Sequence, residues 1–370
     1  MKYKILRGIR EVKKRKPEFL KSSYLKAKIA DMIFEKWLEK YKKNFTLQKS
    51  SRILIISMEA LGDNVVKTTS IKKISEYYGK ENIYIMCRDK WECVFNELGY
   101  NVIGMQKIKN PIKNVRYKIK FFKKLNELHF QKVILLDHLS DGKILKNLIS
   151  NEKIGISNEE NKYMTKEIKM PEDKWYVLDR QSLIVNELLN QSFTKEDLRP
   201  DMREMFKEKK YDNVISIGIG ASSEQKTLPI NKMTEILEML SKRYPNKKIV
   251  FLGNGKKQEY YSKQLIENCN CKNIESYIGK ISLIETMRVI NDSDFFLGYD
   301  SGLSNIAFAL RKKYVCLFWT DMTVWQHPFD DLKIIKGDGI NPENDGYHGT
   351  DILNSIKIEQ VEEALEELKL

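Results

Sequence analysis

The chain alternates between short apolar runs and longer segments in which apolar residues recur every three or four positions. The short runs are typical of buried strands, and the longer segments of helices that pack one face on a sheet. The predicted strands are residues 52–57, 83–87, 132–136, 154–156, 213–219, 248–252, 295–298, 314–319 and 333–336, with a further short strand at 352. The predicted helices are residues 24–45, 64–78, 114–128, 172–189, 230–243, 258–267, 283–291 and 358–369. This alternation predicts an α/β protein built from two successive doubly wound halves.

The chain has 370 residues, which exceeds one typical hydrophobic core and suggests two domains with an extra element. In open α/β sheets, ligands bind beyond the carboxyl ends of the strands, so the cleft between the domains is the expected site. The expected divisions are a basic helical arm at 1–50, a first domain at 51–190, a second domain at 191–355 and a closing helix at 356–370.

Positive charge is concentrated at the start of the chain. Residues 1–50 hold sixteen Lys or Arg and five Asp or Glu, so they carry +11 of the total +14 and leave +3 for the remainder. The helix predicted at 24–45 has an apolar stripe (Ile29, Ile33, Trp37 and Tyr41) surrounded by lysines. Such a helix suits an anionic membrane surface. The alternative is a helix that packs this stripe on the body of the protein. No nucleic-acid motif accompanies the charge, so a nucleic-acid partner is not expected.

Composition excludes several classes of protein. No apolar run approaches the ~20 residues that span a bilayer, and no apolar secretory core follows the basic start. The histidines are scattered and the cysteine spacing fits no zinc pattern, so no metal site is expected. Free thiols in a reducing cytoplasm are expected for all five cysteines, which are Cys87, Cys93, Cys269, Cys271 and Cys316.

A strand, tight turn and helix at 295–310 offer the clearest candidate for a binding site. Asp300, Ser301 and Gly302 form the turn, and the helix begins directly after it. Free N–H groups and the positive end of the helix dipole suit phosphate at that place, and glycine lets a ligand approach the backbone. We interpret the turn as a diphosphate cradle. The alternative is an ordinary helix in which Asp300 or Ser301 is only the N-cap.

Three sequence blocks in this order resemble glycosyltransferase family 9, the heptosyltransferase-like enzymes of bacterial surface-polysaccharide assembly. The first is ILIIS followed by MEALGDNV, a strand and a Gly-Asp loop from residue 53. The second is ISIGIGASSEQKTLP from residue 215, a strand and small-residue loop with lysine and proline before a helix. The third runs from residue 277 to 310 and contains the Asp-Ser-Gly turn. The resemblance covers about residues 51–320.

The resemblance implies the GT-B fold, in which two Rossmann-like domains face each other. It also implies transfer of a sugar, heptose or another, from a nucleotide-sugar donor, with inversion and without a catalytic metal. The nucleotide-sugar is a substrate, so no cofactor is expected. The implied acceptor is a lipopolysaccharide, lipooligosaccharide or other surface glycan, and the implied place is the cytoplasm, at the inner face of the plasma membrane.

Two residues match the family's chemistry. Asp63 matches the proposed base, which takes the proton of the acceptor hydroxyl; an ordinary carboxylate is ionised at neutral pH and can do this. The alternative is that Asp63 is the N-cap of the helix at 64–78. Lys226 is the expected cation for the charge that develops on the leaving nucleotide. Its alternative is a solvated loop lysine.

Further candidates fall on the donor and acceptor sides. Serine hydroxyls, backbone N–H groups and carboxylates would hold phosphates, sugar and ribose on the donor side, although a surface carboxylate is an open alternative for Glu259. The donor-side candidates are Ser222, Ser223, Glu259, Asp300, Ser301, Gly302 and Leu303. The acceptor-side candidates are Gly62, Asn64, Arg88, Asp137 and His138.

The sequence departs from the family at two positions near the donor. Asn305 stands where the family often has histidine, and Trp319-Thr320-Asp321 stands where it usually has Gly-Pro-Thr. These departures leave the donor sugar open. We expect a glycosyltransferase, with a non-catalytic nucleotide- or glycan-binding module of the same fold as the alternative, and a nucleic-acid-binding protein with a basic arm as the third.

Overall fold

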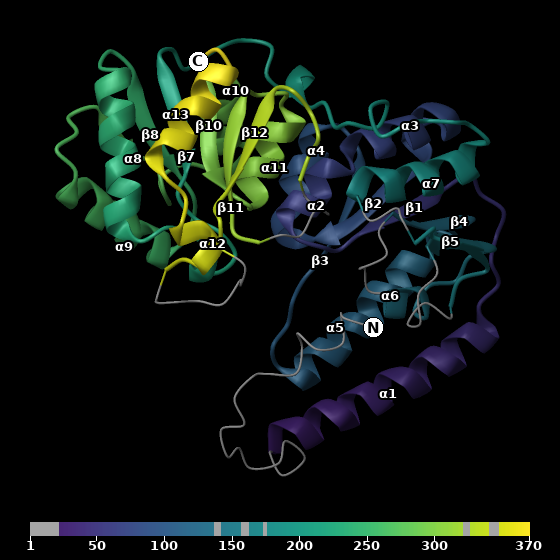
Figure 1. Ribbon diagram of the computed structural model, residues 1–370. Helices are drawn as coiled ribbons and strands as arrows, with labels where there is room; N and C mark the ends of the chain where they lie inside the picture. The colour runs from purple at the N-terminus through teal and green to yellow at the C-terminus, as the bar shows by residue number, and fades with distance from the viewer. Residues whose placement is uncertain (1–21, 137–141, 157–162, 173–175, 321–325, 340–347) are drawn as a thin grey trace.

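Two six-stranded parallel sheets form the body of the protein in this computed structural model, which describes residues 22–136, 142–156, 163–172, 176–320, 326–339 and 348–370 (Figure 1). The strand order is β3-β2-β1-β4-β5-β6 in the first sheet and β12-β11-β10-β7-β8-β9 in the second. The first sheet comprises β1 Ile53–Ser57, β2 Ile83–Arg88, β3 Asn101–Met105, β4 Lys132–Leu135, β5 Glu152–Ile156 and β6 Lys166–Ile168. The second comprises β7 Val214–Gly218, β8 Lys248–Leu252, β9 Ile274–Ser276, β10 Phe295–Tyr299, β11 Tyr314–Phe318 and β12 Leu332–Lys336.

The two sheets share one topology. When the strands of each sheet are counted in chain order, both read 3-2-1-4-5-6, the doubly wound order. The order reverses between β1 and β4 in the first sheet and between β7 and β10 in the second. Ligands bind beyond the strand ends at such reversals. The predicted α/β fold with two doubly wound halves is therefore confirmed.

Helices cover both faces of each sheet. Along β1, Ile53 and Ile55 face α3 and α7, whereas Leu54 and Ile56 face α5 and α6, as the two-residue repeat of a strand requires. The helices of the first half are α2 Leu61–Val66, α3 Thr68–Tyr78, α4 Glu92–Glu97, α5 Pro111–Asn126, α6 Gly142–Leu145 and α7 Val177–Leu189. Those of the second are α8 Ile230–Arg243, α9 Lys256–Asn268, α10 Leu283–Asp292, α11 Gly302–Ala309, α12 Asp351–Asn354 and α13 Ile358–Glu367.

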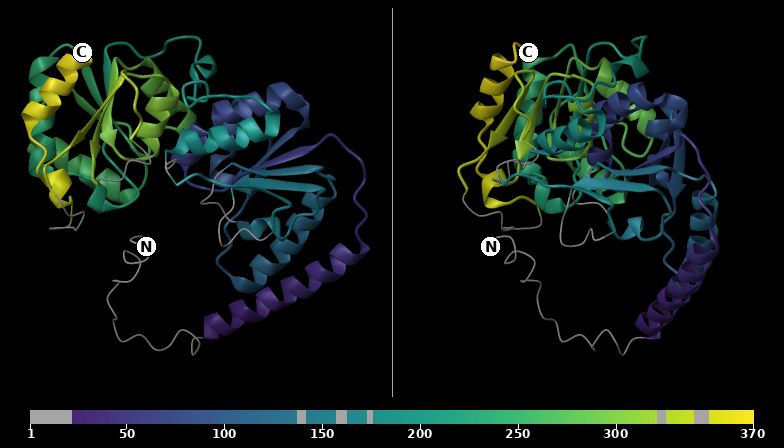
Figure 2. Two further views of the ribbon diagram at one scale, coloured as in Figure 1. Left: turned by 45° about the vertical axis from the view of Figure 1, so that its right-hand side comes forward. Right: turned by 90° about the vertical axis from the view of Figure 1, so that its right-hand side faces the viewer.

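One apolar core is common to both halves. Val65 and Val66 of α2 and Val177 of α7 are buried in the same cluster as Ile306 and Phe308 of α11. In Figure 2, α2 and α11 meet between the two sheets. The halves are thus joined by packed hydrocarbon as well as by the connecting chain.

The N-terminal helix α1, Ser22–Asn44, packs along α5. Ala30, Phe34 and Leu38 are buried against this helix and the first sheet, and the rings of Phe34 and Phe122 lie 5.9 Å apart. The helix therefore packs on the body, but not through the whole predicted stripe: Trp37 and Tyr41 are partly buried, whereas Ile29 and Ile33 are exposed. Residues 1–21, with their basic cluster at 13–16, lie outside the described residues.

Several predicted elements differ from the structure. The helix expected at 64–78 is two helices, α2 and α3, because the chain turns at Lys67, whose buried ammonium group lies 2.7 Å from the Glu59 carboxylate. Residue 352, expected in a strand, lies in α12, which Thr350 caps. The short strands β3, β6 and β9 were not predicted. β6 and β9 have only three residues each and include a glutamate, and no side chain of β3 is fully buried.

The prediction of five free thiols is wrong for two cysteines. Cys269 and Cys271, just after α9, form a disulfide, whereas Cys87, Cys93 and Cys316 are free. Their Cα atoms are 5.3 Å apart, which is within the range that a disulfide can bridge. Among the helices that the structure describes, none is long and apolar enough to cross a membrane.

Candidate active site

The loops that follow β1, β7 and β10 carry the principal predicted site residues. Asp63 follows β1, Lys226 lies in the loop after β7, and Asp300 directly follows β10. These strands flank the two reversals of strand order, where the fold leaves room for a ligand. Asp137 and His138, predicted on the acceptor side after β4, lie outside the described residues.

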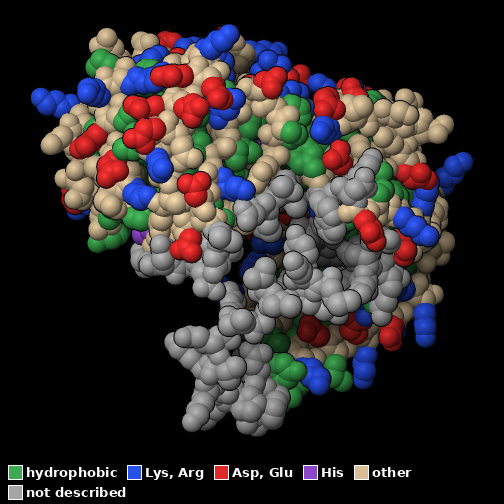
Figure 3. Space-filling view, viewed as in Figure 1, with side chains coloured by type: hydrophobic (Ala, Val, Ile, Leu, Met, Phe, Trp, Pro, Cys, Tyr) green, Lys and Arg blue, Asp and Glu red, His purple; other side chains and the backbone are tan. Residues whose placement is uncertain are grey.

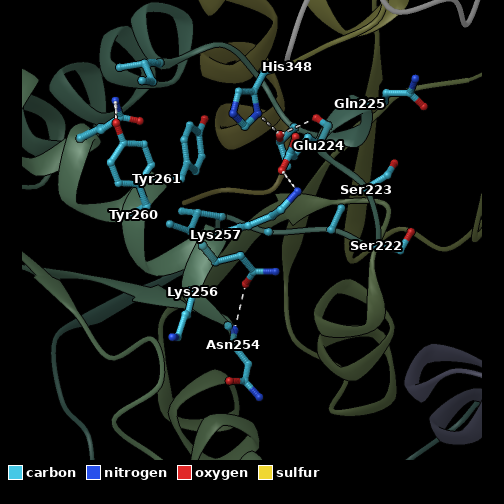
Figure 4. A pocket seen from close by; sticks show the side chains of 18 residues that line it. Ser222, Ser223, Glu224, Gln225, Asn254, Lys256, Lys257, Tyr260, Tyr261 and His348 are labelled. Atoms are coloured by element: carbon cyan, nitrogen blue, oxygen red, sulfur yellow. Dashed lines mark hydrogen bonds and ion pairs between the residues drawn. The ribbon is translucent and has the colours of Figure 1, made fainter. Parts of the chain in front are cut away.

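A cavity of about 1210 Å³ opens beyond the ends of β7 and β8. Ser222 and Ser223 lie on one side, and Tyr260 and Tyr261 on the opposite side (Figure 4). His348 stacks on Tyr261 with 4.9 Å between ring centroids, and its Nδ1 lies 2.5 Å from Thr227 Oγ1. Partial burial lowers the pKa of His348, so this ring is neutral at pH 7. The cavity thus combines aromatic surface with hydroxyl groups, a combination that is common in small-molecule sites.

The start of α9 forms the floor of this cavity. Gly255 is the N-cap with φ of 102°, a conformation that favours glycine, and Gln258 Oε1 accepts a hydrogen bond of 2.9 Å from the Asn254 N–H. Gln258 lines the cavity, whereas Glu259, predicted as a ribose ligand, is exposed and does not line it. Consecutive helical residues point about 100° apart, so Gln258 and Glu259 point in different directions, and the position of Glu259 agrees with the surface-carboxylate alternative.

Lys226 and Asp300 form an ion pair beside the cavity. Lys226 Nζ lies 2.9 Å from Asp300 Oδ2, and the indole N–H of Trp319 donates to the same oxygen at 3.0 Å. The ammonium also lies 4.7 Å from the centre of the Trp319 ring. Lys226 is therefore a partly buried, positioned cation and not a solvated loop lysine. Trp319, where the sequence departs from the family, joins β11 to this pair.

The N-terminus of α11 follows the ion pair directly. Ser301 is its N-cap residue and makes no side-chain capping bond. Among the described residues, the Ser301 hydroxyl is buried and has no hydrogen-bond partner. A buried hydroxyl without a hydrogen-bond partner costs about 1–3 kcal/mol of folding free energy. A ligand that accepts a hydrogen bond from it would remove this cost. Backbone N–H groups of Gly302 and Leu303 belong to the same first turn, which has the positive end of the helix dipole.

Asp63 lies in the third position of α2, and Ala60 is the N-cap. The Asp63 carboxylate accepts a hydrogen bond of 3.2 Å from the Ala60 N–H, so the capping alternative holds in modified form. The side chain remains partly exposed. A capped but accessible carboxylate is oriented by its backbone partner and can still meet an acceptor hydroxyl.

Arg88 and Asn64, predicted on the acceptor side, brace the loop that carries Asp63. Arg88 Nε donates to the Met58 carbonyl at 2.6 Å, and Asn64 Nδ2 donates to the Ala60 carbonyl at 2.7 Å. The buried pair of Lys67 and Glu59 closes the same loop. These contacts fix the position of the Asp63 backbone.

The turns at Gly62 and Gly302 touch each other. A Cβ on Gly62 would lie 2.6 Å from Asn305 Nδ2, and one on Gly302 would lie 3.4 Å from the Leu61 side chain. The sequence predicted a binding site in the cleft between the two domains. At these two turns α2 and α11 are in contact, and the cavity described above is lined by residues of the second half alone.

A buried chain of hydrogen bonds was not predicted. Tyr176 Oη lies 2.8 Å from His327 Nδ1, and His327 Nε2 lies 3.0 Å from Asn305 Oδ1. Asn305 Nδ2 in turn donates to the Ser301 carbonyl at 3.1 Å. His327 also stacks on Phe308 with 3.7 Å between ring centroids. Only the departure at Asn305 gave a sequence signal, since the other partners are far apart along the chain.

The two doubly wound halves define a protein with the GT-B fold. Within the described ranges, no three His, Cys, Asp or Glu side chains gather as a metal site. The sequence profile of glycosyltransferase family 9 (heptosyltransferase) matches residues 119–352. The chain belongs to glycosyltransferase family 9 and is a glycosyltransferase.

Individual relatives agree with this assignment. Lipopolysaccharide heptosyltransferase 1 of Campylobacter coli is 24% identical over 290 residues, which cover 72% of this chain and 83% of that protein. The structure of E. coli heptosyltransferase WaaC with ADP superposes with a TM-score of 0.71 at 16% identity, covering 86% of this chain and 99% of WaaC. A family 9 glycosyltransferase from Veillonella parvula gives 0.70 at 17% identity, with 88% and 99% covered. At these identities the structures establish the shared fold.

Proposed function

We propose that the protein transfers heptose or a related sugar from a nucleotide diphosphate sugar, with ADP-heptose as the first candidate, to a lipopolysaccharide-type acceptor. The transfer inverts the anomeric centre and needs no metal. A relative at 24% identity is a lipopolysaccharide heptosyltransferase, and a solved neighbour binds ADP. The acceptor is held in the membrane by its lipid, so the proposed place of reaction is the cytoplasm at the inner face of the plasma membrane.

On the donor side, the nucleoside would occupy the cavity between the serines and the tyrosines, and the diphosphate would extend toward Lys226 and α11. The ion pair of Lys226 and Asp300 supports this path, because it joins the loop that lines the cavity to the turn that leads into α11. Lys226 would offset the negative charge that develops on the leaving nucleotide. The first-turn N–H groups of α11 and the Ser301 hydroxyl would supply hydrogen bonds to the phosphates.

On the acceptor side, Asp63 would remove the proton from the attacking hydroxyl as that oxygen bonds to the anomeric carbon. The bond from that carbon to the phosphate oxygen breaks, and the nucleotide diphosphate leaves with the electron pair. A positioned carboxylate contributes about 10²–10⁴-fold to such a step. The brace formed by Arg88 and Asn64 supports the role, since it orients the Asp63 loop.

The observation that carries the proposal is the ion pair of Lys226 and Asp300 between a nucleotide-sized cavity and the start of α11. The test incubates the purified chain with ADP-heptose and a heptose-free lipopolysaccharide acceptor, with and without a chelator. Mass spectrometry should show addition of one heptose and release of ADP in both conditions. Thermal shifts with ADP, UDP and GDP would identify the base by mass action. Nucleotide binding without donor consumption on any acceptor would contradict transferase activity, and loss with chelator would contradict metal independence.

A further inference from the structure

Helix α1 has a second apolar face that no described part of the protein covers. Its buried face is formed by Ala30, Phe34 and Leu38, four residues apart. Leu25, Ile29, Met32 and Ile33 lie on the opposite side and retain 49–57% relative exposure. Of the nine large hydrophobic side chains exposed among the described residues, five fall between residues 24 and 33. Exposed apolar groups gathered in this way mark an interaction surface.

The same outward face becomes basic toward the end of the helix. Lys36, Lys40 and Lys43 follow Met32 at spacings of three or four residues, which keeps them on that face, and all three are exposed. In Figure 3, apolar and basic side chains occur together along the lower edge of the protein, where α1 lies. The outward face of α1 is therefore apolar in its first half and cationic in its second.

Helix α5 extends this surface. It contains six Lys or Arg and no Asp or Glu. Phe34 meets Phe122, and Tyr41 Oη donates to the Lys123 carbonyl, so α1 and α5 run in the same direction. The first turn of α5, where Ile112 is 54% exposed, thus lies toward the apolar end of α1. Figure 1 shows both helices beginning at the same edge of the molecule.

We infer that the outward face of α1, with the first turn of α5, docks the enzyme on an anionic lipid surface. Aliphatic side chains would enter the boundary between headgroups and acyl chains, and the lysines would lie among anionic headgroups. Lysine is depleted in protein–protein interfaces, so a basic border favours lipid over a second protein. The residues of this docking surface are separate from those of the donor site. The role of docking rests on the proposed function, because it would bring the enzyme to an acceptor that is held in the membrane.

The test measures co-sedimentation of the full chain with vesicles of phosphatidylglycerol and phosphatidylcholine, or of phosphatidylcholine alone. We expect binding to the anionic vesicles, at least tenfold weaker binding for the triple variant Leu25→Ser, Ile29→Ser, Ile33→Ser, and loss of the anionic preference for Lys36→Gln, Lys40→Gln, Lys43→Gln. The matched control is Tyr77→Ser with Ile266→Ser, two exposed apolar side chains elsewhere. Equal binding to neutral vesicles, or an unchanged triple serine variant, would overturn the inference.

Two further measurements separate the alternatives. If sedimentation velocity shows a dimer that the serine variant abolishes, and the parent does not bind vesicles, this face is a dimer interface and the inference is wrong. Transfer to a delipidated acceptor should be equal in parent and serine variant, whereas transfer to acceptor embedded in anionic vesicles should fall with vesicle binding. Absence of transfer to either acceptor would contradict the proposed function, and vesicle binding alone would then decide the docking surface.

Discussion

His327 Nε2 lies 3.0 Å from Asn305 Oδ1, which directs the amide nitrogen of Asn305 toward the Ser301 carbonyl and toward Gly62. One buried imidazole thereby orients a side chain that touches both turns of the candidate site. The contact also links the halves, because His327 Nδ1 meets Tyr176 at the start of the helix that covers the first sheet.

Stability should depend on pH through His327. Burial, and to a smaller extent the positive charge of Arg199, lowers the pKa of His327 to about 3, compared with about 6.5 in the unfolded chain. As pH falls, this histidine therefore takes up a proton in the unfolded chain before it does so in the folded protein. Its contribution to the free energy of unfolding is complete above about pH 7 and is lost as pH falls toward 3. The free energy of unfolding, measured with denaturant across this pH range, should fall less steeply for His327→Gln than for the parent. His129→Asn, at a partly exposed histidine, is the control and should follow the parent curve.

Replacing Asp63 with Asn should separate binding from chemistry. Asparagine retains the size and the hydrogen-bonding oxygen of the side chain but cannot take the acceptor proton. Turnover should fall by about 10²–10⁴-fold, while the thermal shift with the preferred nucleotide is unchanged. Glu97→Gln, an exposed carboxylate at the end of α4, should retain full turnover. Undiminished activity of Asp63→Asn would refute its role as the base.

Lys226 and Asp300 should be coupled in stability but not in catalysis. Lys226→Met leaves the largely buried Asp300 carboxylate without its cation, so the variant should lose stability and about 10²–10³-fold in turnover. Adding Asp300→Asn removes the unpaired charge and should restore stability without restoring turnover. Lys232→Met on α8 is the control for loss of a lysine. Recovery of turnover in the double variant would show that Lys226 is only structural.

The contact between the two turns can be tested with a methyl group. A Cβ on Gly62 would lie 2.6 Å from Asn305 Nδ2, so Gly62→Ala should cost about 1–3 kcal/mol in unfolding free energy and reduce turnover. Truncating Asn305 to Ala removes the obstacle. In a double-mutant cycle, Gly62→Ala should therefore cost less in the Asn305→Ala background. Additive costs would show that the two residues do not meet in solution.

The strand pattern predicted most of both sheets because their central strands are buried on both faces and read as unbroken apolar runs. It did not predict the turn at Lys67, since that lysine is buried only through its tertiary partner Glu59. The Asp-Ser-Gly turn and Lys226 were found from local motifs, whereas their ion pair joins residues 74 positions apart. Gln258 was missed because helix register decides which side chain enters the cavity, and His327 because its partners come from separate elements.

The hydrocarbon shared by α2, α7 and α11 constrains how this enzyme can move. Pulling the sheets apart would bring Val65, Val66 and Phe308, each fully buried, into water at about 25 cal/mol per Å². Relative motion that keeps this contact, a small sliding or rocking of α2 on α11, avoids that cost. Entry and release of the proposed substrates should then depend on movement of the loops around the cavity, while α2 and α11 stay in contact.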